Sequence, residues 1–163
     1  MDAKAAGGNQ REVLVFVLGS EEYAVDILKV QEIRGYDKVT PIPAAPDFLK
    51  GIVNLRGTIV PVIDLRVKFG LPPRYDATTV MIVLRLGARV IGVVVDGVSD
   101  TLPLAPADIK AAPGLGAVVD ASYLAGLATK DGRMILLLDI ERFLSSDELR
   151  LIAGAASGVA ERA

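Results

Sequence analysis

Few residues in this sequence could do chemistry, and one pair of carboxylates is the first to consider. Asp96 and Asp100 lie four residues apart, separated by Gly-Val-Ser. Two carboxylates at this spacing could act as a general acid and base, or as oxygen ligands of a hard cation. A glycine directly after Asp96 favours a turn over a helix, so the simpler interpretation is a turn followed by a solvated edge charge.

Other catalytic constellations are missing from the sequence. The chain contains no histidine and no cysteine, which removes the commonest general base, the commonest metal ligand and any thiolate. The segment Pro113–Gly116 lacks both the Lys-Ser/Thr pair of a phosphate loop and the third glycine of a dinucleotide fingerprint. Asp64 and Asp139 each precede a short helical pattern and are interpreted as N-caps. We therefore predict a protein that is not an enzyme and holds no metal or cofactor.

Arg56 is the strongest candidate for a binding residue. The pair Arg56-Gly57 joins Ile52-Val53 to the β-branched run 58–63, a pattern typical of a hairpin in which Gly57 adopts a positive φ. Asn, Asp or Gly would form this turn at lower cost than Arg. A guanidinium held on a rigid tip suits recognition of a carboxylate or of backbone carbonyls. The alternative is an ordinary surface arginine.

Composition limits the class of protein. Of the 163 residues, 52% are apolar and only 5% aromatic, which predicts an aliphatic core, and abundant Val, Ile and Thr favour a mainly β fold. The balance of 18 basic and 20 acidic residues argues against nucleic-acid binding. The N-terminal residues 1–11 lack the apolar region of a signal peptide, and runs such as 134–138 are too short to insert in a bilayer. We predict a cytoplasmic domain without disulfides.

The strands and helices that must position these residues follow from periodicity and turn signals. Residues 1–11 are predicted to be disordered, and Pro41, Pro43 and Pro46 interrupt the chain with an irregular connector. The predicted elements are strands at Val13–Leu18 and Glu22–Leu28, an extended segment at Val30–Arg34, hairpins within 47–64 and 122–139, short helices at Leu65–Phe69 and Ile140–Leu144, and a C-terminal helix from Asp147 through Ile152.

An internal repeat organises these elements. Gly19 and Gly87 are 68 residues apart, and later Gly51 and Gly126 are 75 apart. The same two offsets match further pairs, among them Val15 with Val83, Val25 with Val93, Val30 with Val98, Glu32 with Asp100, Gly57 with Gly132 and Asp64 with Asp139. We predict two pseudo-symmetric five-stranded barrels packed together, roughly 20–75 and 78–144, with an N-terminal strand that either barrel could share. The alternative is chance similarity between two β-rich halves.

The repeat separates fold from function at the hairpin tip. Where the first copy has Arg56-Gly57, the second has the ordinary turn pair Asp131-Gly132, so the turn does not need an arginine. Arg34 is likewise matched only by a leucine. We therefore expect Glu32, Arg34 and Arg56 to belong to a surface specific to the first copy.

Several motifs together resemble a known family. They are Leu18–Tyr23, Ile27–Arg34, Asn54–Gly57, Ile59–Arg66, Val94–Asp100 and Tyr123–Gly126. The chain is similar over residues 12–155, as a single domain with flexible tails at 1–11 and 156–163, to CheW-type chemotaxis coupling proteins. The resemblance implies two interlocked SH3-like barrels. It also implies a non-enzymatic adaptor that links the cytoplasmic tips of chemoreceptors to the regulatory domain of the histidine kinase CheA.

The resemblance also implies roles for particular residues and a location in the cell. Receptor binding is expected at Asn54, Leu55, Arg56 and Gly57, and kinase binding at Val30, Glu32, Ile33 and Arg34. Leu115 is expected at a second contact that closes rings of adaptor and kinase. With no receiver or kinase segment attached, a stand-alone coupler is expected, recruited from the cytoplasm to membrane-bound receptor arrays. For Val30 and Ile33 the alternative is a place in the core.

Two other functions compete with the adaptor. One is a barrel that binds a small ligand or ion through Asp96 and Asp100. The other is an SH3-like peptide binder, which the scarcity of aromatic residues disfavours because proline-rich ligands dock on aromatic grooves.

Overall fold

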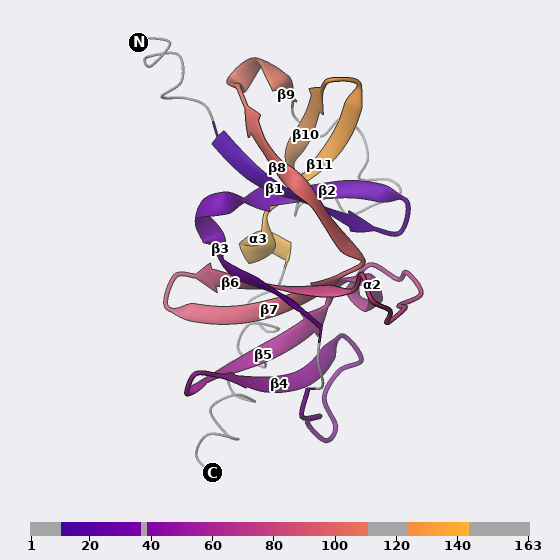
Figure 1. The fold of residues 1–163 in the computed structure, drawn as a ribbon, viewed down its shortest axis with the longest axis vertical. Helices are drawn as coiled ribbons and strands as arrows, with labels where there is room; N and C mark the ends of the chain where they lie inside the picture. The colour runs from indigo at the N-terminus through magenta and orange to yellow at the C-terminus, as the bar shows by residue number, and fades with distance from the viewer. Residues whose placement is uncertain (1–10, 37–38, 111–123, 144–163) are drawn as a thin grey trace.

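Eleven strands form two sheets in the computed structural model, which describes residues 11–36, 39–110 and 124–143 (Figure 1). The six-stranded sheet has the order β8-β1-β2-β11-β10-β9 and contains β1 (Arg11–Leu18), β2 (Glu21–Asp26), β8 (Gly97–Leu104), β9 (Ile109–Lys110), β10 (Leu124–Lys130) and β11 (Arg133–Leu138). The five-stranded sheet has the order β3-β6-β7-β5-β4 and contains β3 (Val30–Gly35), β4 (Leu49–Leu55), β5 (Thr58–Asp64), β6 (Val80–Leu86) and β7 (Arg89–Val95). The mainly β prediction is confirmed.

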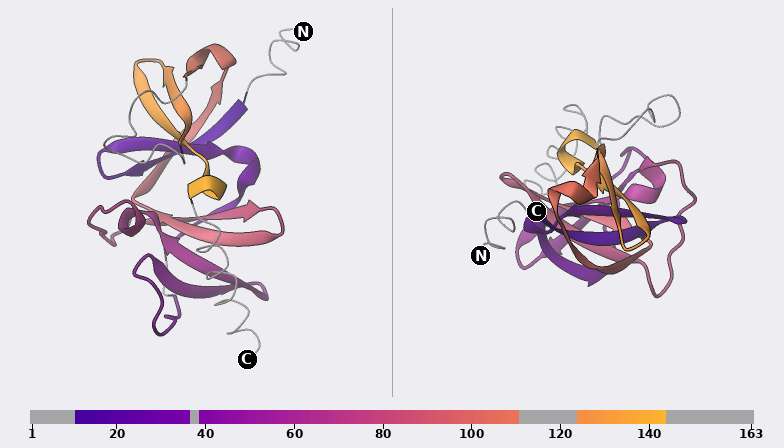
Figure 2. Two further views of the ribbon diagram at one scale, coloured as in Figure 1. Left: turned by 180° about the vertical axis from the view of Figure 1, so that it is seen from behind. Right: turned by 90° about the horizontal axis from the view of Figure 1, so that it is seen from above.

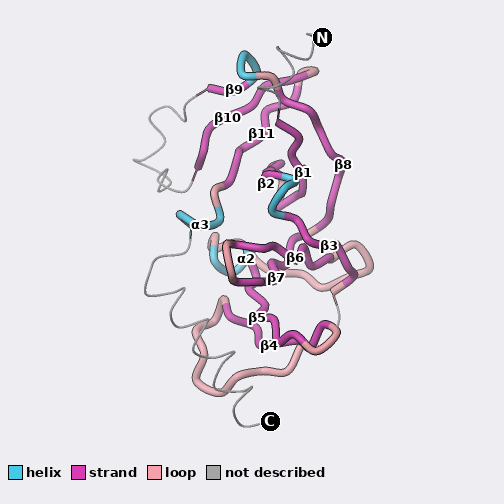
Figure 3. Tube along the Cα trace, turned by 90° about the vertical axis from the view of Figure 1, so that its left-hand side faces the viewer, coloured by secondary structure: helices cyan, strands magenta, loops and turns pink. Residues whose placement is uncertain are grey.

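The helical segments of the described residues are short (Figure 3). They are η1 (Ile27–Lys29), α2 (Leu65–Lys68), η2 (Pro106–Asp108) and α3 (Ile140–Phe143), and none is long and apolar enough to cross a membrane. The carboxylate of Asp64 accepts the Arg66 N–H at 2.9 Å, and that of Asp139 accepts the Glu141 N–H at 3.1 Å. Both predicted N-caps are therefore confirmed. Leu144 and the predicted helix from Asp147 lie outside the described residues.

Each sheet draws strands from both copies of the repeat, which differs from the predicted division into barrels at 20–75 and 78–144. The hairpin β1–β2 lies in one sheet with β8 to β11, and the hairpin β6–β7 lies in the other with β3, β4 and β5. The chain crosses between sheets at η1 and again at Asp96. The repeat identifies equivalent strands, but it cannot tell which copy supplies each neighbour, because the apolar pattern of a strand is the same for either partner.

Strand register confirms the repeat itself. Phe16 on β1 lies opposite Val98 on β8, and the residues 68 positions away, Leu84 and Val30, lie opposite each other on β6 and β3. Along β8 a register shift follows directly after Val98, and along β3 a register shift follows directly after the equivalent Val30. Parallel pairing also occurs at matched places, between β2 and β11 and between β5 and β7. Chance similarity between the halves would not reproduce these irregularities.

Matched glycines close the two barrels. Thr40 pairs with Ile52 of β4 through two backbone hydrogen bonds of 2.9 Å, and β9 pairs with β10 in the same place of the other barrel. A Cβ on Gly51 would collide with the carbonyl oxygen of Thr40, and one on Gly126 would lie 2.8 Å from that of Lys110. Only glycine permits this close approach of two backbones.

The largest hydrophobic core is shared by the two barrels. It contains Phe16 of β1, Ile63 of β5, Ile82 of β6, Leu138 of β11 and Ile140 of α3, all buried, together with other residues of both sheets. Figures 1 and 2 show α3 between the sheets, where Ile140 joins this core. We call the five-stranded sheet the first barrel and the six-stranded sheet the second barrel, and a smaller aliphatic core lies within each. A shared core of this kind holds the two barrels as one packed unit.

Two strand ends differ from prediction by two residues. Strand β1 begins at Arg11, which pairs with Leu104 of β8, so it starts two residues earlier than the pattern indicated. Strand β2 ends at Asp26 rather than Leu28, because the Asp26 carboxylate accepts the Leu28 N–H at 3.0 Å and begins η1. Short polar side chains compete with a strand ladder for backbone hydrogen bonds in this way.

Candidate interaction surface

The β4–β5 turn holds Arg56 in a left-handed conformation. Arg56 has φ 53° and Gly57 has φ 92°, and the equivalent β10–β11 turn has φ 54° at Asp131 and 77° at Gly132. Positive φ at both central residues defines the two-residue turn that suits a twisted hairpin. An arginine in this conformation is strained by roughly 1–2 kcal/mol, whereas aspartate tolerates it better. The geometry thus agrees with the prediction that the turn does not need Arg56.

Glu32 on β3 joins two arginines from different elements. Its Oε1 accepts a hydrogen bond from Arg56 Nη2 at 3.0 Å, and its Oε2 accepts one from Arg34 Nη1 at 3.3 Å. The hydrogen bond from Arg56 is the main reason that the pKa of Glu32 lies below its ordinary value. We call these three residues the first-barrel cluster. It brings together residues that the family resemblance assigns to separate receptor and kinase sites, and it agrees with the single surface that the repeat predicts.

The first-barrel cluster is accessible and carries a net charge of +1. The side chain of Arg56 is 68% exposed and that of Glu32 is 26% exposed. Among contacts with the described residues, Arg56 uses only Nη2, which leaves its other N–H groups for a partner. Such an arrangement can bind a carboxylate or a backbone carbonyl.

The remaining predicted residues fall into different environments. Ile33 is 44% exposed on the edge strand β3, whereas Val30 is half-buried against the shared core. Leu55 is only 7% exposed and packs within the first barrel. Asn54 is exposed and its side chain accepts the Gly57 N–H at 2.8 Å. Leu115 lies outside the described residues.

A groove runs between β3 and β4 beside the cluster. It is lined by Arg34, Gly35, Thr40, Ile52, Val53, Asn54, Leu55 and Met81. The groove therefore connects the β3 edge with the hairpin that carries Arg56, and a partner could contact both at once.

The second barrel has a cluster of opposite charge. Arg133 on β11 pairs with Glu22 and with Asp100, each at 3.0 Å. The hydrogen bond from Arg133 lowers the pKa of Asp100. Asp100 and Glu32 occupy equivalent places, but the second barrel has one arginine between two acids, a net charge of −1.

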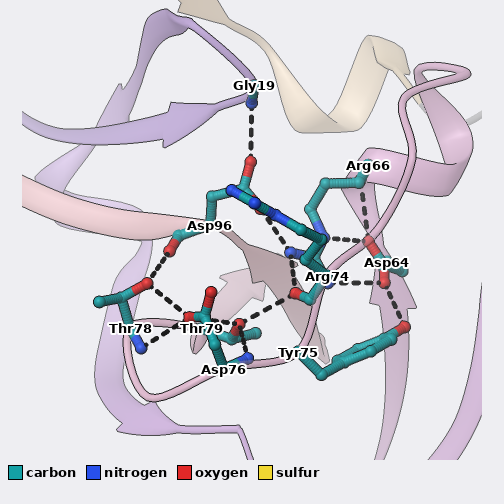
Figure 4. A network of polar contacts seen from close by, with 9 residues as sticks. All are labelled: Gly19, Asp64, Arg66, Arg74, Tyr75, Asp76, Thr78, Thr79 and Asp96. Atoms are coloured by element: carbon teal, nitrogen blue, oxygen red, sulfur yellow. Dashed lines mark hydrogen bonds and ion pairs between the residues drawn. The ribbon is translucent and has the colours of Figure 1, made fainter.

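A buried ion network was not predicted from the sequence (Figure 4). Arg66 and Asp64 are both fully buried, and Arg66 Nε donates to Asp64 Oδ1 at 2.6 Å. Arg66 Nη1 donates to Asp96 Oδ1 at 2.6 Å, and the Tyr75 hydroxyl donates to Asp64 Oδ2 at 2.6 Å. Burial raises the pKa of Asp64, but the hydrogen bonds from Arg66 and Tyr75 outweigh burial and hold it below its ordinary value. The only local sign of this network in the sequence is the spacing of Arg66, which follows the N-cap residue Asp64 by two positions.

Asp96 links this network to the other sheet. Its Oδ2 accepts the N–H of Gly19 in the β1–β2 turn at 2.7 Å (Figure 4). Asp96 and Asp100 therefore engage different arginines instead of facing each other. Within the described part of the chain, no group of three or more Asp, Glu, His or Cys residues could hold a metal ion. The ion-binding hypothesis has no support in this geometry.

Comparison with known proteins identifies the family. The model of the CheW-like domain matches residues 12–148. The chain is 55% identical to the chemotaxis protein CheW of Klebsiella aerogenes over 147 residues, which is 90% of this chain and 89% of that protein. It is 35% identical to the CheW protein of Rhizobium meliloti, covering 90% and 95%. The crystal structure of the scaffolding protein TtCheW from Thermoanaerobacter tengcongensis aligns with a TM-score of 0.73 and 33% identity, covering 78% of this chain and 88% of that one.

The fold and the charged surface clusters indicate the general class of this protein, and the sequence comparisons then identify its family. Two interlocked SH3-like barrels with charged clusters on their surfaces define the class, and they share their fold with the scaffolding protein TtCheW. The chain belongs to the CheW family of chemotaxis coupling proteins. The predicted family, fold and absence of enzymatic activity are confirmed.

Proposed function

We propose that this chain binds chemoreceptor cytoplasmic tips and the CheA regulatory domain through the first-barrel cluster and the edge of β3 beside it. The observation that carries the proposal is the bridging of Glu32 to both Arg56 and Arg34, which joins the hairpin tip to β3. Membership of the CheW family supports the choice of partners. The protein then works in the cytoplasm, recruited to receptor arrays.

Energetics favour a binding role for the cluster over a folding role. An exposed ion pair contributes only about 0–1 kcal/mol to stability. The left-handed conformation of Arg56 costs a similar amount, so the pair gives the fold little net benefit. Strained backbone that the fold does not need is found preferentially at functional positions.

The division of contacts follows the elements. Arg56 stands on the hairpin tip, where its remaining donors suit acidic or carbonyl groups of the receptor. Ile33 and Arg34 lie on β3, an edge strand, and an exposed apolar residue such as Ile33 on a strand edge favours contact with another protein. We propose that the CheA regulatory domain binds this edge and buries Ile33. Leu115 remains a proposed second kinase contact.

A capture experiment tests the proposal. An immobilised chemoreceptor cytoplasmic fragment should retain the CheA regulatory domain only when the wild-type chain is added. The variant Arg56→Asp should lose most of this retention while remaining folded, because aspartate already forms the equivalent turn at position 131. Full retention of the kinase domain by Arg56→Asp would remove the cluster from the contact.

A further inference from the structure

The β4–β5 turn has a side-chain cap that its counterpart lacks. Asn54 Oδ1 accepts the N–H of Gly57 at 2.8 Å. The residue 75 positions on is Thr129, and among the described residues no side chain accepts the N–H of Gly132. Both turns nevertheless have positive φ at their two central residues. The cap is therefore not required to form the turn.

The cap acts on the peptide unit next to Arg56. The Gly57 N–H belongs to the peptide bond that joins Arg56 to Gly57, so holding this N–H restrains ψ of Arg56. The turn would otherwise be free to relax the left-handed conformation of an arginine, which is unfavourable. Asn54 thus restrains the backbone from which the guanidinium reaches Glu32.

We infer that Asn54 is a positioning residue for Arg56, and that it serves partner binding through Arg56 instead of touching the receptor itself. This inference rests on the proposed function of the first-barrel cluster. It assigns to Asn54 a conformational role that the equivalent Thr129 does not have. Pre-organising a binding side chain in this way raises affinity, because less conformational freedom is lost on association.

The chain supplies its own matched variants for a test. Asn54→Thr gives the first hairpin the residue of the second, and Thr129→Asn is the reverse exchange. We expect Asn54→Thr to weaken binding of a chemoreceptor cytoplasmic fragment about three- to tenfold, the effect of losing one hydrogen bond. Thr129→Asn should bind that fragment as the wild type does.

Two further measurements separate positioning from direct contact. In an Arg56→Asp background, Asn54→Thr should cause no additional loss of affinity, because Asn54 acts through the arginine. Amide hydrogen exchange of Gly57, followed by nuclear magnetic resonance, should become faster in Asn54→Thr, while exchange of the β4 amides from Leu49 to Val53 is unchanged.

The outcomes distinguish this inference from the proposed function. If Arg56→Asp alone leaves affinity unchanged, the proposed function fails. If Arg56→Asp weakens binding but Asn54→Thr does not, the proposed function survives and the positioning role is overturned. A full additional loss from Asn54→Thr in the Arg56→Asp background would also overturn it, because Asn54 would then contact the receptor directly.

Discussion

Replacing Arg66 by methionine tests how much the buried network contributes to folding. Arg66 is fully buried and supplies two hydrogen bonds to Asp64 and one to Asp96. Without it, the equally buried carboxylate of Asp64 keeps the Tyr75 hydroxyl and a backbone N–H but loses its charge partner. Removing one member of a buried ion pair costs about 3–5 kcal/mol. For a domain of this size, that loss corresponds to a fall of roughly 6–20 °C in Tm.

A second substitution shows whether the unpaired charge causes the loss. Asn is as good an N-cap as Asp, so Asp64→Asn keeps the cap of α2 and removes only the charge. The double variant Arg66→Met/Asp64→Asn should therefore melt at a higher temperature than Arg66→Met alone. Circular dichroism on heating measures both. The reasoning is refuted if Arg66→Met melts within about 2 °C of the wild type, or if the double variant is less stable than the single one.

The pH dependence of Tm and a substitution at Gly51 provide two more tests of the fold. The pKa of Asp64 is lower in the folded protein than in the unfolded chain, so its stabilisation is present above about pH 4 and is lost as the pH falls through the lowered pKa. Tm should thus fall more steeply with acid in the wild type than in Arg66→Met/Asp64→Asn, and parallel profiles would contradict this. Gly51→Ala should lower the free energy of unfolding by about 1–3 kcal/mol, because the new Cβ would collide with the carbonyl oxygen of Thr40. Gly35→Ala is the control, since a Cβ there has nothing within 4 Å; equal Tm values for the two variants would exclude a steric role for Gly51.

Local features of the fold could be predicted from the sequence because they depend on neighbouring residues. The Arg56-Gly57 turn and the caps at Asp64 and Asp139 follow from short-range patterns. The exchange of hairpins between barrels could not be predicted in this way. It depends on which strands meet across the shared core, and both arrangements satisfy the same alternation of apolar residues.

The polar contacts between distant residues could not be predicted from local sequence patterns either. Glu32 and Arg56 are 24 residues apart, and Arg66 and Asp96 are 30 apart, so only the folded chain brings each pair together. The repeat did indicate that Glu32, Arg34 and Arg56 share a surface, because Arg34 and Arg56 are matched by Leu102 and Asp131 and so have no basic counterpart in the second copy. Burial of Leu55 was missed, since an apolar residue beside a turn has no local signal that tells a core position from an exposed one.

The affinity and stability of Arg56→Asp, measured on the same preparation, test the central claim most directly. Titration calorimetry with a receptor cytoplasmic fragment should show a loss of about 2–5 kcal/mol, as for a charged contact truncated at an interface. Tm should change little, because the pair with Glu32 is exposed. The control Asp131→Arg introduces the same strain in the other hairpin and should leave affinity unchanged. Unchanged affinity in Arg56→Asp, or a collapse of its Tm, would contradict a recognition role for the first-barrel cluster.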